Sequence, residues 1–125
     1  MSTEIRKNVL TLIKQVEQGQ ILEAFDTFYA DSVAMQENSS APTVGKAANR
    51  AREEQFVASV AEVHEVRAKS WSAGENKAAI EWALDFTNTE GTRLRMEQVA
   101  LQTWENGKIV HERFYYDTAS LIVQG

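Results

Sequence analysis

The first part of the chain carries apolar residues at a helical spacing. Within residues 4–18 these positions recur every three or four residues and form a single stripe. The stripe comprises Ile5, Val9, Leu12, Ile13 and Val16. Gly19 follows it, and a glycine at this point is typical of a left-handed helix end. The pattern therefore predicts an amphipathic helix that packs one side on a core.

Two further helices are predicted before residue 60. A short one begins after Gly19 and turns large side chains toward the core: Ile21, Leu22, Phe25, Phe28 and Tyr29. The connection is tight, so the first two helices should pack at an angle. Residues 46–58 are rich in alanine and in charge and predict a third helix. Its expected buried side consists of Ala47, Ala48, Ala51 and Phe56.

The remaining segments alternate with a period of two, which is typical of half-buried strands. Residues 33–37 predict a short strand before a polar loop at 38–42. The clearest alternation places Ile80, Trp82, Leu84 and Phe86 on one face. Further strands are expected over about 62–71, 77–86, 93–104 and 108–117, joined by turns. Asn106-Gly107 is the strongest of the turn signals. Helices followed by an antiparallel meander predict the α+β class.

Composition narrows the function classes. A chain of 125 residues fits one domain, 1–125, and the absence of cysteine excludes disulfides, thiol catalysis and cysteine-ligated metals. The net charge of −5 argues against nucleic acid and anionic membrane surfaces as partners. No apolar run is long enough to span a bilayer, and no export signal opens the chain. These features predict a cytoplasmic protein.

The motif inventory predicts neither a metal nor a cofactor. His64 and His111 are the only histidines, and they show neither HxH nor HxxxH spacing. A glycine-rich phosphate loop, a dinucleotide fingerprint and a GxSxG nucleophile elbow are all missing from the sequence. Any catalysis must then depend on carboxylates, tyrosine and amides.

Three stretches together carry a family resemblance. They are residues 28–37 (FYADSVAMQE), the helix that Gly45 precedes, and residues 104–109 (WENGKI) followed by 114–117 (FYYD). In this order and spacing the chain resembles the nuclear transport factor 2-like superfamily, in particular its small SnoaL-like members. The resemblance implies a cone in which three helices and a strongly curved, mainly antiparallel sheet enclose an apolar pocket. The superfamily includes isomerases, cyclases, dehydratases, hydrolases and non-catalytic binders, so the fold does not decide the function.

Strand alternation then selects the residues that can reach such a pocket. The apolar positions expected to line it are Met35, Trp82, Phe86 and Phe114. The polar positions on the same faces are Glu37, Gln98, Gln102, Glu112 and Tyr116. A mostly apolar cavity with a few convergent polar groups is typical of a small-molecule site. The expected ligand is a small molecule of apolar or mixed polarity.

Glu37 is the first candidate for catalysis. It falls where the related ketosteroid isomerases keep their carboxylate base, and an apolar pocket raises the pKa of a carboxyl toward neutrality. Glu112 or Tyr116 would then act as the acid or as the orienting group. The alternative is a strand-end carboxylate that is exposed, or paired with Arg50 or Arg52 within a solvated, mixed-charge helix face at 50–54.

The departures from known members restrict the reaction. The isomerase oxyanion donors align with Leu12 and Ala100, neither of which can donate a hydrogen bond through its side chain. The histidine and aspartate of SnoaL-like cyclases align with Glu112 and Phe114. Neither established set of residues is therefore present.

The outer face of the sheet is the expected homodimer interface. Val99, Leu101, Arg113 and Tyr115 share this face with Ile109, and without a partner Val99, Leu101, Ile109 and Tyr115 would form an exposed apolar patch. Arg113 is expected to pair with Glu81 or Asp85, either across the sheet or across the dimer axis. The alternative is a solvated face.

The sequence leaves three functions open. The first is a cofactor-independent isomerase, cyclase, dehydratase or hydrolase that uses carboxylates. The second is a non-catalytic binding protein with the same pocket. The third is a dimeric interaction protein whose cone is filled with packed core.

Overall fold

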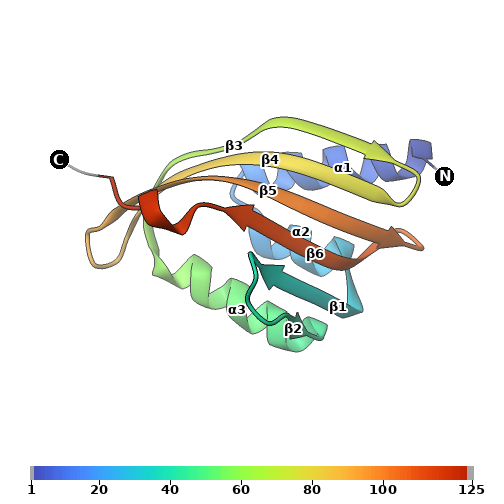
Figure 1. Ribbon diagram of the computed structural model, residues 1–125, viewed down its shortest axis with the longest axis horizontal. Helices are drawn as coiled ribbons and strands as arrows, with labels where there is room; N and C mark the ends of the chain where they lie inside the picture. Colours follow the sequence, from blue (N-terminus) through green and yellow to red (C-terminus); the bar gives the residue numbers. More distant parts are fainter. Residues whose placement is uncertain (1, 124–125) are drawn as a thin grey trace.

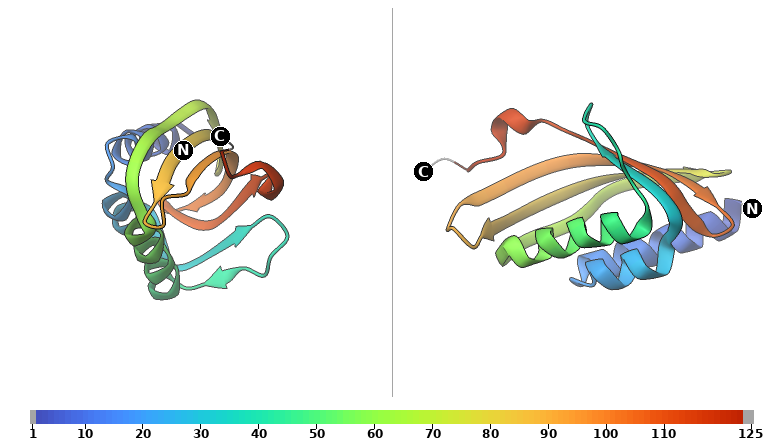
Figure 2. Two further views of the ribbon diagram at one scale, coloured as in Figure 1. Left: turned by 90° about the vertical axis from the view of Figure 1, so that its left-hand side faces the viewer. Right: turned by 90° about the horizontal axis from the view of Figure 1, so that it is seen from below.

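Six strands form one sheet that curves around three helices on one of its faces (Figures 1 and 2). The computed structural model describes residues 2–123. The elements are α1 (Ser2–Glu17), α2 (Ile21–Phe28), β1 (Tyr29–Glu37), β2 (Thr43–Val44), α3 (Lys46–Ser59), β3 (Val60–Gly74), β4 (Lys77–Asn88), β5 (Arg93–Glu105), β6 (Lys108–Tyr116) and a 3₁₀ turn, η1 (Thr118–Ser120). The strand order is β2-β1-β6-β5-β4-β3. This mixed sheet with its helices confirms the α+β prediction.

The two N-terminal helices supply one side of the core. The predicted stripe of α1 is buried from Ile5 to Ile13, and Val16 is partly buried beside it. Helix α2 ends at Phe28, so the prediction that Tyr29 continues the helix is wrong. Tyr29 instead begins β1, where its buried ring stacks on Phe25 with centroids 4.6 Å apart. Tyr29 is therefore a residue of the sheet and not of the helix.

The pairing of β1 with β6 joins distant parts of the sequence. The two strands run parallel, and Met35 lies opposite Glu112 while Glu37 lies opposite Phe114. All other strand pairs are antiparallel. Asn106 and Gly107 both adopt positive φ in the turn between β5 and β6, as the Asn-Gly signal predicts. The ends of β1 and β6 therefore lie side by side (Figure 1).

Strand β4 is buried on both faces. Its inner positions Ile80, Trp82 and Phe86 are buried as the alternation predicts. On the outer face Asp85 is only 5% exposed, because the guanidinium groups of Arg93 and Arg95 cover it with hydrogen bonds of 2.8 to 3.3 Å. These two bidentate contacts hold the pKa of Asp85 well below its ordinary value.

Two expectations for the outer face are wrong within the single chain. Ile109 is fully buried, because the register of β5 and β6 shifts after Thr103 and pairs Ile109 with the buried Trp104. Arg113 pairs with neither Glu81 nor Asp85 of its own sheet. Asp85 is already occupied by its β5 neighbours, and Glu81 instead pairs with Lys69 and accepts a hydrogen bond from Ser70. Arg113 donates to the backbone carbonyl of Asn38 at 2.9 Å and lies 4.7 Å from the centre of the Tyr115 ring. It therefore ties the loop after β1 to β6.

Helix α3 turns Phe56 inward as predicted, but the rest of its inner side differs from the prediction. Ala47, Ala48 and Ala51 are exposed, and the inner side consists of Asn49, Glu53 and Phe56. Asn49 is 2% exposed and donates to the carbonyl oxygens of Thr43 and Gly45, both at 2.9 Å, and of Val33 at 3.3 Å. These carbonyls lie in or beside β1 and β2, and those of Val33 and Gly45 also accept from backbone N–H groups, so Asn49 adds a side-chain donor that a methyl group could not supply. A polar residue therefore anchors α3 to the sheet.

Within residues 2–123, no helix is both long enough and apolar enough to cross a membrane.

Candidate active site

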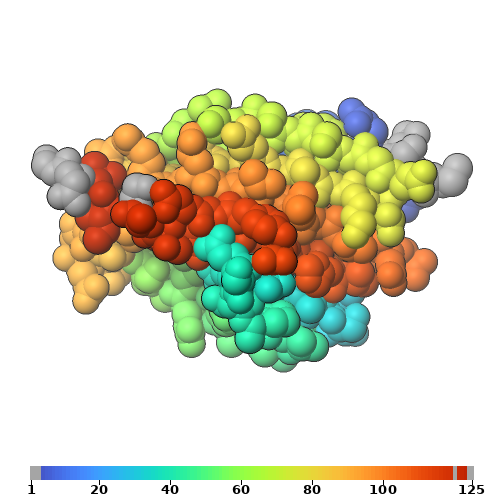
Figure 3. Space-filling model, viewed as in Figure 1, coloured from blue at the N-terminus to red at the C-terminus, as the bar shows by residue number. Residues whose placement is uncertain are grey.

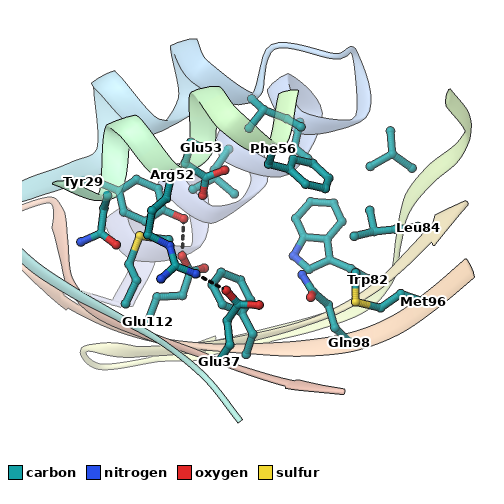
Figure 4. A pocket seen from close by; sticks show the side chains of 17 residues that line it. Tyr29, Glu37, Arg52, Glu53, Phe56, Trp82, Leu84, Met96, Gln98 and Glu112 are labelled. Atoms are coloured by element: carbon teal, nitrogen blue, oxygen red, sulfur yellow. Dashed lines mark hydrogen bonds and ion pairs between the residues drawn. The ribbon is translucent and has the colours of Figure 1, made fainter. Parts of the chain in front are cut away.

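A cavity of about 260 Å³ lies between the helices and the inner face of the sheet (Figure 4). Its lining comes from all three helices and from every strand except β2: Leu12, Val16, Ile21, Tyr29, Met35, Glu37, Asn49, Arg52, Glu53, Phe56, Val66, Trp82, Leu84, Met96, Gln98, Glu112 and Phe114. Its two ends differ in chemistry. Figure 4 shows the carboxyl groups, Tyr29 and Arg52 at one end, with Phe56, Trp82, Leu84 and Met96 toward the other. The lining therefore suits a molecule with a polar end and an apolar body.

Glu112 is the most buried carboxyl group of the cavity, with 1% of its surface exposed. The Tyr29 hydroxyl donates to Oε1, and the side-chain amide of Gln102 donates to Oε2 at 2.8 Å. Burial raises the pKa of Glu112 to about 7, against the lowering effect of both hydrogen bonds, and the charge of Glu53 raises it further. Glu112 can thus change protonation near neutral pH.

Glu53 reaches the cavity from α3 and is half-buried. Burial raises its pKa to about 7, the charge of Glu37 contributes in the same direction, and Arg52 opposes them. Among residues 2–123 no hydrogen-bond partner of its carboxyl group is found. The expectation of a fully solvated helix face at 50–54 is therefore wrong at Glu53. The spacing of Asn49, Glu53 and Phe56, four and then three residues apart, is the signal that could have identified this side of the helix.

Glu37 lies at the end of β1, and both of its oxygens are engaged. Arg52 forms an ion pair with Oε2, and the hydroxyl of Tyr116 donates to Oε1 at 2.5 Å. The pairing with Arg52 is one of the alternatives that the sequence left open, yet Glu37 also lines the cavity. Burial and this hydrogen bond raise the pKa of Tyr116 to about 12. Glu37 is therefore held in one orientation by two donors.

A second, smaller pocket lies on the other side of this ion pair. Its lining combines Met35, Glu37 and Arg52, which it shares with the main cavity, with five residues from the loop after β1 and the C-terminal end of the sheet. Those five are Asn38, Ser40, Ala41, Tyr116 and Thr118. The Glu37–Arg52 pair thus separates the two spaces.

Most of the residues selected by strand alternation surround the main cavity. Met35, Trp82, Gln98 and Phe114 line it together with Glu37 and Glu112. Three others lie beyond the lining. Gln102 is buried behind Glu112, Phe86 packs edge-on against Phe56 with centroids 5.4 Å apart, and Tyr116 lines the smaller pocket. Sequence reasoning missed Tyr29, Arg52 and Glu53 as lining residues.

The positions aligned with the isomerase donors are apolar here. Leu12 lines the cavity and Ala100 is fully buried. Within residues 2–123 no group of three or more histidine, aspartate or glutamate side chains is arranged to hold a metal ion. The titratable chemistry of the cavity is therefore that of its carboxyl groups and tyrosines.

Comparison with family models matches the SnoaL-like domain to residues 3–116. The chain belongs to the SnoaL-like family. A comparison with curated proteins finds no match. Among solved structures, a protein from Mesorhizobium loti provisionally named a SnoaL-like polyketide cyclase superposes with a TM-score of 0.80, at 29% identity over 90% of this chain and 98% of that chain.

Two more distant structures share the fold with this SnoaL-like chain. SalBIII, described as an epoxide hydrolase/cyclase-like enzyme in pyran ring formation in the polyether salinomycin, gives a TM-score of 0.77 at 22% identity over 95% of each chain. A protein from Catenulispora acidiphila with a ketosteroid isomerase-like fold, in complex with trimethylamine, gives 0.75 at 16% identity over 90% of this chain and 88% of that chain.

Proposed function

We propose that this SnoaL-like protein is a cofactor-independent enzyme that moves protons on a small, largely apolar molecule. The observation that carries this proposal is the carboxyl group of Glu53, which faces the cavity without a hydrogen-bond partner within residues 2–123 and has a pKa of about 7. A group that titrates near the working pH and is free to contact a ligand is suited to general acid–base catalysis.

Glu53 fits the role of base better than Glu37, the candidate selected from the sequence. Arg52 and Tyr116 engage both oxygens of Glu37, and a proton acceptor needs a free lone pair directed at its substrate. In this proposal Glu37 orients Arg52 at the polar end of the cavity, and Glu112 serves as the second titratable group. The walls formed by Trp82 and its apolar neighbours hold the body of the substrate.

The class of reaction follows from the residues and is supported by the relatives. Isomerisation, cyclisation, dehydration and epoxide opening each need one proton removed and one supplied, which two carboxyl groups that titrate near neutrality can do without a cofactor. The M. loti protein, named for polyketide cyclisation, and SalBIII, described as epoxide hydrolase/cyclase-like, fall within the same kind of chemistry.

Proton exchange in D₂O tests the proposal. Small cyclic ketones and epoxides are incubated with the protein, and NMR follows deuterium incorporation and ring opening. The wild type should accelerate at least one of these reactions, and Glu53→Gln should reduce the rate at least about 100-fold. Glu54→Gln is the matched control, because Glu54 is the next residue on α3, is exposed and pairs with Arg50. Equal rates in Glu53→Gln and the wild type would refute Glu53 as the base.

A specific observation supports the second candidate, a non-catalytic binding protein. All four oxygens of Glu37 and Glu112 already accept hydrogen bonds from the protein, as they would in a cavity built only to hold a ligand. This function would be favoured if a ketone or epoxide of the panel bound in the cavity and neither exchanged nor opened.

We also propose that the chain forms a homodimer through the outer face of the sheet. Val99, Leu101 and Tyr115 are 37%, 44% and 40% exposed, and the pairing of β5 with β6 places them on the outer face of the sheet. Figure 3 shows the molecule from the side on which β5 and β6 are exposed. Large apolar side chains grouped in this way favour a protein partner over water. Arg113, beside Tyr115, would lie at the same interface.

A further inference from the structure

A chain of hydrogen bonds with a fixed direction leads from Trp104 to Glu112. The indole Nε1 of Trp104 donates to Oε1 of Gln102 at 3.0 Å. An indole N–H can only donate, so the Gln102 amide must present its oxygen to Trp104 and its NH₂ group to Glu112. The distance from Nε2 of Gln102 to Oε2 of Glu112 is 2.8 Å. Trp104 therefore determines which atom of Gln102 faces the carboxyl group.

This direction decides where a proton on Glu112 can sit. The amide nitrogen of Gln102 has no lone pair to accept a hydrogen bond, so Oε2 of Glu112 must remain the acceptor. Protonation then takes place on Oε1, whose partner is the hydroxyl of Tyr29. With 1% of Glu112 exposed, water does not offer Oε1 an alternative partner.

The Tyr29 hydroxyl consequently has two states. When Glu112 is ionised, the O–H of Tyr29 points at Oε1, and the lone pairs of the phenol oxygen remain available to the cavity that Tyr29 lines. When Glu112 is protonated, Oε1–H donates to the phenol oxygen, so Tyr29 must turn its own hydrogen away from Glu112. Figure 4 shows the Tyr29 hydroxyl in contact with Glu112 at the polar end of the cavity.

We propose that Tyr29 delivers the proton of Glu112 to an oxygen atom of the ligand, such as a carbonyl, epoxide or departing hydroxyl oxygen. The inference extends the proposed function and depends on it for the existence of a substrate. In the step, the O–H bond of Tyr29 breaks as a new O–H bond forms on the ligand. Tyr29 takes the Oε1 proton of Glu112, and Glu112 is left as the carboxylate. Tyr29 is thus a catalytic residue, and Gln102 and Trp104 are positioning residues.

The neighbouring charges are compatible with this transfer. Burial and the charges of Glu112 and Glu53 raise the pKa of Tyr29 well above its ordinary value, so the phenol is neutral before and after the step. Glu53 on α3 is the other titratable group that acts on both Tyr29 and Glu112. Glu37 at the end of β1 is engaged by Arg52 and Tyr116. Because Glu53 titrates in the same range as Glu112, the test must separate the two.

Infrared spectroscopy of bound cyclohexanone, labelled with ¹³C at the carbonyl, provides the test. This ketone can only accept a hydrogen bond, and a donor lowers its carbonyl stretching frequency. In the wild type the frequency should fall as the pH is lowered through the pKa of Glu112, and Tyr29→Phe should abolish the change. Glu112→Gln mimics the protonated acid, because the introduced amide oxygen accepts from Gln102 and its NH₂ donates to Tyr29. In this variant the lowered frequency should persist at every pH.

Two controls make the result specific. Glu53→Gln should keep the pH-dependent shift, although its midpoint can move. Tyr116→Phe removes the other tyrosine hydroxyl bound to a glutamate and should also keep the shift. A shift that survives in Tyr29→Phe, that disappears in Glu53→Gln, or that is absent from the wild type would overturn the inference. The measurement needs no turnover, so an inactive protein that shows the shift contradicts only the proposed enzyme function.

A second measurement needs neither a ligand nor a substitution, so it remains possible if the variants fold poorly. In protein labelled with ¹³C at the tyrosine ζ carbons, the Tyr29 signal should change with the titration of Glu112, and the Tyr116 signal should not follow it. A Tyr29 signal that is indifferent to this titration would refute the coupling.

Discussion

The hydroxyl of Tyr116 donates to Oε1 of Glu37 and thereby joins the last residue of β6 to the last residue of β1. The two residues are 79 positions apart in the sequence, and the distance between the bonded oxygen atoms is 2.5 Å. Together with Arg52 it fixes the carboxylate that separates the main cavity from the smaller pocket.

Replacing Tyr116 by phenylalanine should therefore lower the free energy of unfolding by about 1 kcal/mol, the net contribution of one partly exposed hydrogen bond. Urea denaturation measures this loss. Tyr115→Phe is the control, since the Tyr115 ring contacts Arg113 and its hydroxyl forms no hydrogen bond found within residues 2–123. Equal losses in both variants would contradict the role of the Glu37 contact.

The stability of the protein should fall as the pH rises from about 4.5 to about 7. Glu112 has a pKa of about 7 in the folded state and its ordinary value in the unfolded chain, so in this interval the unfolded chain has lost a proton that the folded protein retains. The loss from Glu112 should be about 3 kcal/mol, at about 1.4 kcal/mol for each pH unit of the interval. Glu53 is half-buried and should add a smaller loss in the same direction.

Chemical denaturation at a series of pH values measures this slope. Glu112→Gln should remove most of it, and Glu65→Gln, at an exposed position on β3, should leave it unchanged. Asp85 does not interfere, because its pKa is lowered and its contribution is lost only as the pH falls below about 4. Stability that rises between pH 4.5 and 7 would contradict the assignment.

Asn49→Leu should destabilise the protein by about 3 kcal/mol. The change deletes three donated hydrogen bonds and leaves buried carbonyl oxygens of Val33 and Thr43 without this donor. Thermal unfolding followed by circular dichroism detects the effect. Gln55→Leu, an exposed position on the same helix, should change the stability by less than about 0.5 kcal/mol. If Asn49→Leu changed the stability as little as Gln55→Leu, the hydrogen bonds of Asn49 would not be what holds α3 on the sheet.

Leu101→Lys should convert the proposed dimer to monomer, because it places a charge in the middle of the outer apolar face. Light scattering after size-exclusion chromatography gives the mass of each variant. Val63→Lys is the control: Val63 is 59% exposed and pairs across the strands with Phe86, so it lies on the opposite face of the sheet. A wild type that is monomeric at high concentration would refute the dimer.

Periodicity predicted the parts of the fold where one face is uniformly apolar. The stripe of α1 and the alternation of β4 are of this kind, and Asn106-Gly107 marked its turn because few other residues tolerate that backbone. Alternation also brought Glu37 and Glu112 to one cavity, since the face of a strand is fixed by parity alone. These predictions depend only on local geometry.

Helix α3 could not be predicted in this way. The inner side of α3 carries Asn49 and Glu53. A prediction based on the hydrophobic pattern places such polar residues in the solvent. Asn49 faces inward because its amide donates to the carbonyl oxygens of Val33 and Thr43, and Glu53 faces inward onto the cavity. Other segments of the chain supply both of these surroundings. The same holds for Arg113, whose partner depends on which neighbour had already occupied Asp85. At these positions long-range contacts override the preference that the local pattern predicts.

The parallel pairing of β1 with β6 has a consequence for the order of folding. β6 lies between β1 and β5, so during synthesis β1 cannot join β3, β4 and β5 in one sheet until residues 108–116 have been made. The contacts of Tyr29 with Glu112 and of Glu37 with Tyr116 span 83 and 79 positions, and contacts of such separation form slowly. A shortened chain without its last strand would lose both pairs at once. Completion of the sheet and formation of these two tyrosine–glutamate pairs are therefore the same event.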